Sequence, residues 1–325
     1  MRSITLSLLT TLLCFSGSAR AQQLPGNPNS GTVTVSTSVV NTLTPYTNNS
    51  NGTINFVSGG NLTNDMVGTM NNSGMISLSS GGILTNCGTL INDPHGTINN
   101  NLGGYMDNTL NGTLYNLHDL YNNSGATLKN DGLIVTMHPA QFISCGTYVG
   151  NGTIEGEWMD NGVLKAGNQV VQERGAASRM PSSAGVLTTE GNYYKRAGSL
   201  EIELGGLFDG GGNKALTEFD WLDVTGDVEL AGTLEVYLID SFELLAGMSF
   251  EILKVGGTLT GEYDGLDEGH KVGSFSGTNL YITYAGGNGN DVTLYSQDAG
   301  PAIPEPAAIL LAIMGLALLP RRRRR

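Results

Sequence analysis

A five-residue unit, Gly-x-apolar-x-Asn, recurs from Gly52 to about Asn130 and constrains the fold more than any other part of the chain. The apolar residues of successive units are separated by six or eight positions only, at Ile54, Leu62, Met70, Ile76, Leu84, Leu90, Ile98, Met106, Leu114, Leu120, Leu128 and Ile134. Even steps keep side chains on one face of an extended backbone, whereas a helix requires steps of three or four. The repeat therefore predicts short strands with one inward face.

Three successive units contain 20 to 24 residues, which is enough for one coil of a three-sided solenoid. We therefore predict an all-β fold, a right-handed parallel β-helix over residues 51–167. Because Gly and Asn tolerate left-handed backbone conformations, we expect them to form the turns. Side-chain ladders along the turns are predicted for Asn64, Asn72, Asn86, Asn92, Asn100, Asn108, Asn116, Asn122 and Asn130. A carbohydrate-binding polar face is the alternative interpretation of these asparagines.

The sequence changes character on both sides of the repeat. Residues 22–50 predict an irregular segment with one short strand at 32–35, and residues 168–184 predict a linker or lateral loop. From 185 to 298 the alternation is longer, as in 199–204 and 232–238. We expect a second β-rich domain there, either an antiparallel sheet or sandwich, or widened coils of the β-helix.

The N-terminus has the pattern of a secretory signal peptide over residues 1–21. Arg2 precedes an apolar segment, and small residues lead to Ala19 and Ala21. This arrangement predicts cleavage after Ala21, which leaves Gln22 as the first mature residue. The expected partners are the Sec export machinery and signal peptidase.

The C-terminal tail, residues 299–325, combines three features. Pro304, Glu305 and Pro306 precede an uncharged apolar run at 307–319, and the last residues are Arg321, Arg322, Arg323, Arg324 and Arg325. As a helix, the run is about 20 Å long, shorter than the roughly 30 Å hydrocarbon core of a bilayer. The arginines orient such a tail with its basic end in the cytoplasm and the body outside.

This tail resembles the PEP-CTERM sorting signal of exopolysaccharide-producing Gram-negative bacteria. The resemblance implies processing near Pro304–Pro306 by exosortase, a membrane protease-transpeptidase, after transient anchoring in the inner membrane. The final location is then the cell surface or the extracellular space. An ordinary C-terminal membrane anchor after a proline-rich hinge is the alternative, and it also places the body outside.

A second resemblance covers about 100 residues of the C-terminal part. Gly198–Gly206, Phe219–Gly226, Leu230–Leu234, Phe250–Leu253 and Gly289–Leu294 resemble the C-terminal β module of autotransporter-passenger-like secreted proteins. The resemblance implies a pectin-lyase-like architecture for the body.

Charge and cysteine content narrow the set of partners. Between the predicted signal and tail, the body has nine basic and 28 acidic residues, a net charge of −19. Nucleic acid and anionic lipid are repelled by such a body, because their binding depends on Lys and Arg. Its two cysteines, Cys87 and Cys145, form either a disulfide or two buried thiols outside the cytoplasm.

Enzymes built on parallel β-helices act on polysaccharides, so catalytic residues need a specific test. Between Gln22 and Glu173 there is no arginine, and the only lysines are Lys129 and Lys165. We expect one turn-capping aspartate per repeat at Asp65, Asp93, Asp107, Asp119 and Asp131, and turn or surface histidines at His95, His118, His138 and His270. No catalytic residue is predicted.

No metal or cofactor is predicted either. Gly286–Asp291 matches the start of the Ca²⁺-binding nonapeptide of secreted toxins once. Because calcium in that motif is held between stacked copies, we expect a hairpin turn, with Ca²⁺ binding as the alternative.

These observations favour an exported, non-enzymatic surface or extracellular-matrix protein associated with exopolysaccharide or biofilm. Its expected mechanism is physical: a rigid solenoid that presents a polar Asn and Thr ladder. A surface-displayed polysaccharide lyase or hydrolase is the first alternative, and a glycan-binding or partner-binding adhesin is the second.

Overall fold

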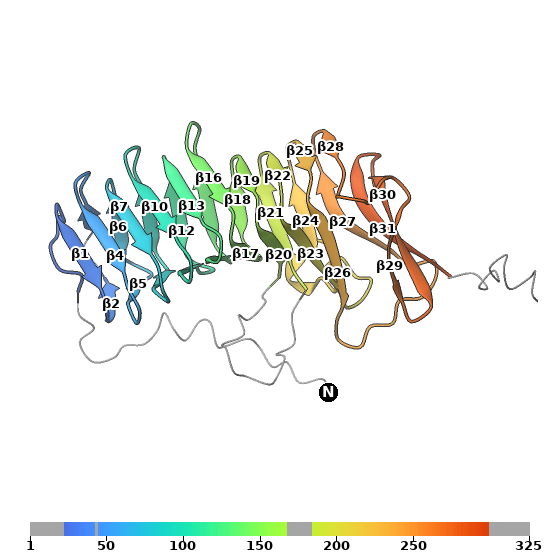
Figure 1. The fold of residues 1–325 in the computed structure, drawn as a ribbon, viewed down its shortest axis with the longest axis horizontal. Helices are drawn as coiled ribbons and strands as arrows, with labels where there is room; N and C mark the ends of the chain where they lie inside the picture. The colour runs from blue at the N-terminus through green and yellow to red at the C-terminus, as the bar shows by residue number, and fades with distance from the viewer. Residues whose placement is uncertain (1–22, 43–44, 168–183, 299–325) are drawn as a thin grey trace, which may run out of the picture.

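The structure is a computed structural model that describes residues 23–42, 45–167 and 184–298. These residues form an elongated rod of stacked coils, with the first coil at one end and an antiparallel hairpin region at the other (Figure 1). The predicted signal-peptide residues Ala19, Ala21 and Gln22 and the tail residues Pro304, Glu305, Pro306 and Arg321 to Arg325 lie outside the described residues, as does 168–183 of the predicted linker. The part of the chain that the structure describes contains no helix with the length and apolar character needed to cross a bilayer.

Three long sheets run along the rod, and every third strand falls in the same sheet. The first sheet contains β1 (Thr32–Val35), β4 (Thr53–Phe56), β7 (Met75–Leu78), β10 (Thr97–Asn100), β13 (Asp119–Asn122), β16 (Gln141–Ser144), β19 (Trp158–Asp160), β22 (Tyr193–Lys195), β25 (Val228–Leu230) and β28 (Leu259–Gly261). The second contains β2 (Ser38–Asn41), β5 (Asn61–Asn64), β8 (Ile83–Asn86), β11 (Tyr105–Asn108), β14 (Thr127–Asn130), β17 (Thr147–Gly150), β20 (Val163–Ala166), β23 (Ser199–Leu204) and β26 (Thr233–Leu238).

The third sheet begins in the same parallel manner and ends differently. Its parallel strands are β3 (Tyr46–Asn48), β6 (Thr69–Asn72), β9 (Thr89–Asn92), β12 (Thr113–Asn116), β15 (Leu133–Thr136), β18 (Thr153–Glu155), β21 (Val186–Glu190), β24 (Trp221–Val224) and β27 (Ser249–Val255). Then β31 (Asp291–Asp298), β30 (Thr278–Gly286) and β29 (Lys271–Phe275) add antiparallel strands. A short 3-10 turn, η1 (Lys214–Leu216), lies between β23 and β24. The predicted all-β, parallel and repetitive architecture is therefore confirmed.

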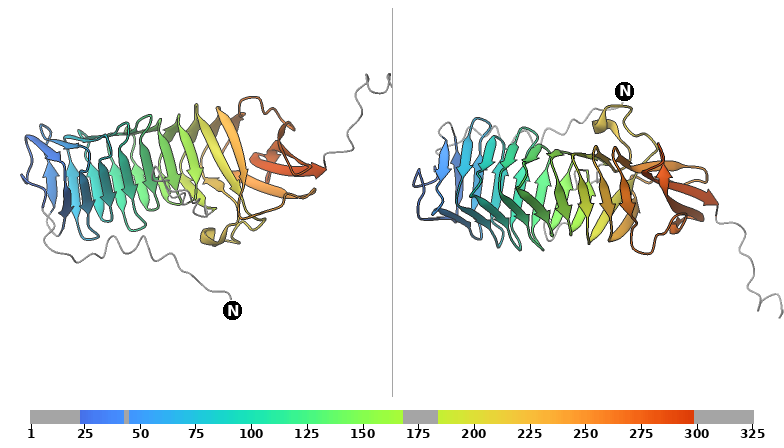
Figure 2. Two further views of the ribbon diagram at one scale, coloured as in Figure 1. Left: turned by 60° about the horizontal axis from the view of Figure 1, so that its bottom comes forward. Right: turned by 90° about the horizontal axis from the view of Figure 1, so that it is seen from above.

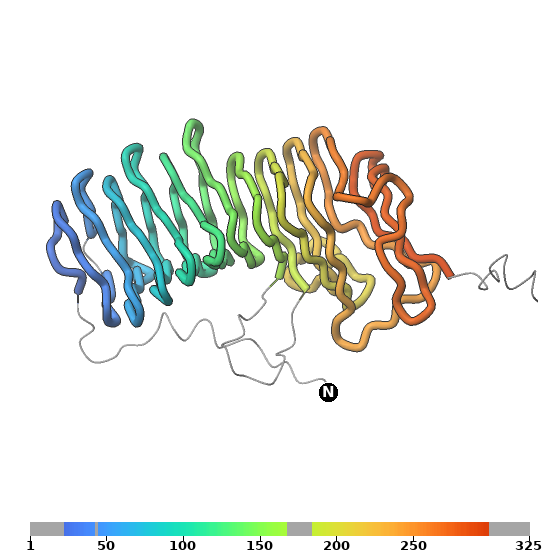
Figure 3. Tube along the Cα trace, viewed as in Figure 1, coloured from blue at the N-terminus to red at the C-terminus, as the bar shows by residue number. Residues whose placement is uncertain are grey.

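The core consists of stacked rows of side chains, one row per sheet. In the first sheet Ile54, Ile76, Ile98, Leu120 and Phe142 are in register from coil to coil. All twelve predicted apolar residues of the repeat are buried, and partners in adjacent coils lie 20 to 24 residues apart in the sequence. The tube in Figure 3 follows these coils along the rod.

The first-sheet row becomes aromatic in the middle of the rod. The rings of Phe142 and Trp158 stack at 5.4 Å, and Trp158 packs on Tyr193 at 5.0 Å. Among the described residues, one core cluster includes side chains from Leu24 to Leu294.

Two predicted boundaries are wrong. The solenoid begins before residue 51, because β1, β2 and β3 already form a coil; only the strand at 32–35 was predicted within 22–50. The boundary near 183 does not separate two sheet systems, since β20 pairs with β23, and β18 with β21, across it. For residues 185–298 we expected either an antiparallel sheet or sandwich, or widened coils of the β-helix. Strands β21 to β28 form widened coils, because they continue the three parallel sheets.

Candidate functional site

Asparagine ladders follow the strand ends at the corners of the rod. The side-chain amide of Asn64 donates to Asn86 Oδ1 at 2.8 Å, Asn86 donates to Asn108 at 2.8 Å, and Asn108 donates to Asn130 at 2.7 Å. Each amide also reaches a backbone carbonyl of the next coil, as Asn86 does with Thr113 O at 3.1 Å. The predicted ladders are confirmed.

All nine predicted ladder asparagines are buried, and the solvent does not reach them. The alternative interpretation as a carbohydrate-binding face is therefore wrong, as is the expectation that the solenoid presents its asparagines. Sequence reasoning also missed Asn41 and Asn48, which donate to Asn64 and Asn72 at 2.8 Å. The sequence could have identified both asparagines, because each is the last residue of a short segment with β-forming residues.

Left-handed turn glycines are confirmed at Gly59, Gly81, Gly103 and Gly125, but the roles of Asn and of the glycine in the five-residue unit differ from the prediction. Each ladder asparagine is the last inward residue of a strand, and the non-glycine residues with positive φ in the described chain are Ser80, Asp240, Ser241 and Ser276. The repeat glycine supplies space. A Cβ on Gly112 would lie 2.2 Å from the carbonyl oxygen of Asn86 and 2.5 Å from Asn108 Oδ1. Glycine is required there because the ladder amide occupies the position of its side chain.

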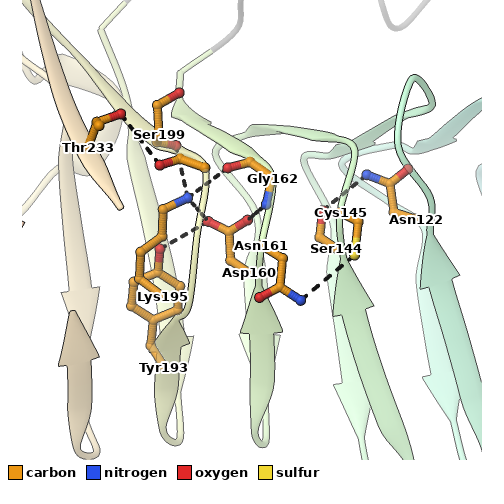
Figure 4. Close-up of polar contacts among 11 residues, drawn as sticks. Asn122, Ser144, Cys145, Asp160, Asn161, Gly162, Tyr193, Lys195, Ser199 and Thr233 are labelled. Carbon is orange, nitrogen blue, oxygen red and sulfur yellow. Dashed lines mark hydrogen bonds and ion pairs between the residues drawn. The ribbon is translucent and has the colours of Figure 1, made fainter. Parts of the chain in front are cut away.

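In the first sheet the same ladder position changes from amides to a buried ion pair. Successive strands place Asn100, Asn122, Ser144, Asp160 and Lys195 there, and Figure 4 shows the last four. The Asp160 and Lys195 side chains are fully buried, and Lys195 Nζ lies 2.7 Å from Asp160 Oδ2.

Both charges of this pair have further partners. Lys195 Nζ donates to the carbonyl oxygens of Gly162 and Ser199 at 2.8 and 2.9 Å. Asp160 accepts the Gly162 N–H at 3.0 Å and the Tyr193 hydroxyl at 3.1 Å. Burial raises the pKa of Asp160 and lowers that of Lys195, and each partner offsets the other's shift. The ammonium thus has three acceptors and the carboxylate has three donors. Because Asp160 and Lys195 belong to adjacent coils, the ion pair links the two coils and has a structural role.

The predicted aspartates divide into two groups. Asp107 and Asp131 converge on Lys129, whose Nζ lies 3.9 and 2.5 Å from their carboxylates. Burial raises the pKa of Asp107 although Lys129 opposes that shift. Asp65 braces its turn by accepting from the Met66 N–H at 2.8 Å, whereas Asp93 accepts from the Ser73 hydroxyl of the preceding coil at 2.7 Å. Turn capping is thus confirmed for Asp65, whereas Asp93 joins two coils and Asp107 and Asp119 lie within strands.

The pairing of Cys87 with Cys145 is wrong. Cys145 is a free, exposed thiol, so the alternative of two buried thiols is wrong as well. Cys87 follows β8 at the corner between the second and third sheets, whereas Cys145 follows β16 at the corner between the first and second. Different corners of the rod keep the two sulfur atoms apart.

The glycine-rich segment Gly286–Asp291 is the hairpin turn between β30 and β31, as predicted. The Asp291 carboxylate accepts the backbone N–H of Val255 at 2.6 Å and that of Asn288 at 3.1 Å. Its oxygens therefore brace the turn against β27. Among the described residues, no group of three or more His, Cys, Asp and Glu side chains is arranged to hold a metal ion.

A groove missed by the sequence reasoning lies on the outer face of the third sheet near its C-terminal end. We call it the terminal groove; its cavity of about 540 Å³ is lined by Leu207, Asp209, Phe219, Ser249, Glu251, Thr283, Gly286, Gly287, Thr293 and Tyr295. Strands β27, β30 and β31 form its floor, and the segment between β23 and β24, which projects from the rod in Figure 2, forms one wall.

The two carboxylates that line the terminal groove, those of Asp209 and Glu251, share one cation, Lys254, which is not itself a lining residue. Its Nζ lies 3.4 Å from Glu251, 3.7 Å from Asp209 and 4.2 Å from the centroid of the Trp221 ring. Burial raises the pKa of Glu251, and Asp291 adds to the rise while Lys254 opposes it. On the same sheet the Tyr295 ring stacks with Tyr281 at 5.6 Å. The lining thus includes the Tyr295 ring, the hydroxyls of Ser249, Thr283 and Thr293 and two carboxylates, groups that contact sugar rings and their hydroxyls.

Comparison with known proteins adds no assignment to this geometry. No protein-family model matches the chain, and no curated protein sequence matches it. The only sequence signal for the groove was the run of glycines and exposed apolar residues before β24, where Leu207 and Phe208 are about half exposed.

Proposed function

We propose that this protein is an exported, non-enzymatic surface or matrix protein whose rigid β-solenoid carries a glycan-binding groove at its C-terminal end. The terminal groove is the observation that carries the proposal, because there outward aromatic, hydroxyl and carboxylate groups share one cavity. The inward rows and ladders, by contrast, are fully used for internal packing and hydrogen bonding. In this proposal the rod provides rigid support, and the terminal groove contacts the glycan.

The ligand class follows from charge. Glu251 and Asp209 accept hydrogen bonds from hydroxyl groups, whereas Tyr295 offers a ring face for stacking. The acidic body disfavours uronic-acid polymers through like-charge repulsion. A neutral polysaccharide is therefore the proposed ligand, and an exopolysaccharide of this kind is the proposed partner at the cell surface.

A binding experiment tests this assignment. We expect the body, residues 22–298, to be retarded in affinity electrophoresis through at least one of dextran, a soluble β-1,3-glucan and galactomannan, and not through alginate. Tyr295→Ala should remove the retardation because it deletes the stacking face. Tyr121→Ala, an outward tyrosine of β13 far from the groove, is the matched control. Equal behaviour of the two variants, or no retardation of the wild type, would contradict the assignment.

Export and sorting are proposed from the terminal sequences. The signal-peptide pattern at 1–21, the Pro304–Pro306 triplet, the short apolar run and the arginine cluster together support delivery through the Sec machinery and processing by an exosortase-type protease. Replacing Pro304, Glu305 and Pro306 with alanine should leave unprocessed protein in the inner membrane. Pro301→Ala is the control, and normal release of the triple variant would remove this part of the proposal.

A second candidate function is polysaccharide hydrolysis in the same groove. Asp209 and Glu251 contact one ammonium group, so their carboxyls are close, and the raised pKa of Glu251 suits a proton donor. Reducing-end release from a glycan that binds the body, abolished by Glu251→Gln while binding persists, would favour hydrolysis. Binding without release favours the non-enzymatic function.

A further inference from the structure

The N-terminal end of the rod has strand edges without a strand partner. In the described chain, β1 pairs with β4 alone and β2 pairs with β5 alone, so each ends its sheet. The edge of β3 is different, because Asn29 donates to Thr47 O at 2.8 Å and accepts from the Asn49 N–H at 2.8 Å. Among the described residues, the segment before β1 thus covers the β3 edge, and the β1 and β2 edges have no strand partner on that side.

This end lacks the charges that usually protect an edge, and its prolines, Pro25, Pro28 and Pro45, lie outside β1 and β2. Residues 23–64 contain no Asp, Glu, Lys, Arg or His, although the body has a net charge of −19. The β1 sequence is Thr-Val-Thr-Val, with Thr32 and Thr34 exposed and Val33 and Val35 buried. Natural edge strands are normally interrupted by charges, proline or bulges, because a regular uncharged edge pairs with another chain.

We propose that the N-terminal end of the rod is a self-association surface, at which the β1 edge of one copy pairs with the β2 edge of a second copy, and its β2 edge with the β1 edge of that copy. A two-fold axis perpendicular to the rod makes all such strand pairs antiparallel and the interface self-complementary. The product is a closed dimer about twice as long as one rod, with a terminal groove at each far end. This inference does not depend on what the groove binds.

Charge selects a second copy, and this orientation, as the occupant. Two uncharged ends meet without like-charge repulsion. Contacts between other parts of two acidic bodies would be opposed by such repulsion. The opposite end has acidic residues at Glu262, Asp264, Asp267 and Glu268, and its third sheet is extended by the antiparallel strands β29 to β31. Head-to-tail stacking would therefore join unlike edges, whereas head-to-head pairing joins the uncharged four-residue edges β1 and β2.

Lysine substitutions on one row of side chains give a matched test. Thr34, Asn55, Ser77 and Asn99 occupy the same outward position on consecutive strands of the first sheet. Thr34→Lys introduces a charge at the edge, and Asn99→Lys introduces the same charge three coils away. Ser38→Lys makes the corresponding change on β2. Sedimentation equilibrium of residues 22–298 at several concentrations measures association, and circular dichroism with thermal unfolding verifies that each variant is folded.

We expect the wild type and Asn99→Lys to form dimers, and Thr34→Lys and Ser38→Lys to raise the dimer dissociation constant by about tenfold or more, which corresponds to about 1.4 kcal/mol. A monomeric wild type at up to about 100 µM, where a dimer of micromolar affinity would be populated, would overturn the proposal. Folded edge variants that dimerise like the wild type would also overturn it, as would equal weakening by Asn99→Lys. Open-ended polymers would exclude the head-to-head form. If both edge variants fail to fold, the wild-type result decides.

Discussion

The Nζ atom of Lys195 and the Oδ2 atom of Asp160 lie 2.7 Å apart inside the rod, on adjacent strands of the first sheet, and neither side chain reaches solvent. They occupy the ladder position that Asn100 and Asn122 fill in earlier coils. A neutral hydrogen-bonded ladder is therefore continued by opposite charges. Removing one partner of such a pair leaves an uncompensated buried charge, so this position is highly sensitive to substitution.

Lys195→Met should lower the free energy of unfolding by about 3–5 kcal/mol, because Asp160 then remains charged and unpaired in the core. Urea unfolding of residues 22–298 at pH 7 measures this change. Arg196→Met is the control, since the adjacent Arg196–Glu229 pair is roughly half exposed and such pairs contribute about 0–1 kcal/mol. Equal effects of the two substitutions would contradict the structural role of the buried pair.

Asn86→Ala should destabilise the solenoid through unpaired ladder groups. Asn86 accepts from Asn64 and donates to Asn108 and Thr113, so its removal leaves buried polar atoms without partners. Each such group costs about 1–3 kcal/mol. Thr85→Ala, on the outward face of the same strand, should change stability by less than about 0.5 kcal/mol. Chemical unfolding of both variants would reveal a wrong assignment if Thr85→Ala proved the more damaging.

Gly112→Ala and Gly81→Ala should separate the two roles of glycine. Gly112 has no room for a Cβ, which would lie 2.2 Å from Asn86 O, whereas Gly81 has open space but φ +85°. Overpacking of this kind typically costs about 1–3 kcal/mol, and sometimes more. A left-handed alanine costs about 1–2 kcal/mol.

Gly81→Asn provides the distinguishing comparison, because asparagine tolerates a left-handed backbone. It should recover most of the stability lost in Gly81→Ala, while Gly112→Asn should be at least as damaging as Gly112→Ala. Thermal unfolding followed by circular dichroism measures all four variants. Recovery at Gly112 would show that its role is conformational after all.

Asp220 should make the body less stable as the pH rises. Its carboxylate is buried and accepts the backbone N–H groups of Gly185 at 2.8 Å and Glu203 at 3.0 Å. Burial, with repulsion from Glu203 as the next cause, raises the pKa of Asp220 well above its usual range. The folded state therefore binds a proton that the unfolded state releases above about pH 4.

The sign of the effect follows from that difference. The contribution of Asp220 is fully present below about pH 4 and is lost as the pH rises towards its raised folded-state pKa, at up to about 1.4 kcal/mol per pH unit. Asp220→Asn removes this titration, and other buried carboxyls remain in both proteins, so the difference between their slopes isolates Asp220. Urea unfolding from pH 4.5 to 8 should show the steeper decline in the wild type. Parallel slopes would refute the prediction.

The repeat and its inward residues were predictable because they depend on local geometry. From Ile54 to Ile134, even spacing determines which side chains share a face, and the same spacing places Asn86 directly before a corner. Sequence reasoning failed where the period disappears. The first coil was missed because Ser38–Asn41 and Tyr46–Asn48 lack the repeat glycine pattern, although their Val39, Asn41, Tyr46 and Asn48 side chains point inward.

The sequence by itself therefore determined the period-two alternation, the parallel coils, the ladder asparagines and the acidic character of the body, since each follows from residue type and spacing along one chain. Only the tertiary structure decided that Asp160 meets Lys195, that Cys87 and Cys145 lie at different corners, and that Asp209 and Glu251 share a groove. These contacts depend on how many residues each irregular coil contains. The length of each coil determines which distant residues come into register. Once the repeat ends, no local sequence pattern specifies that length.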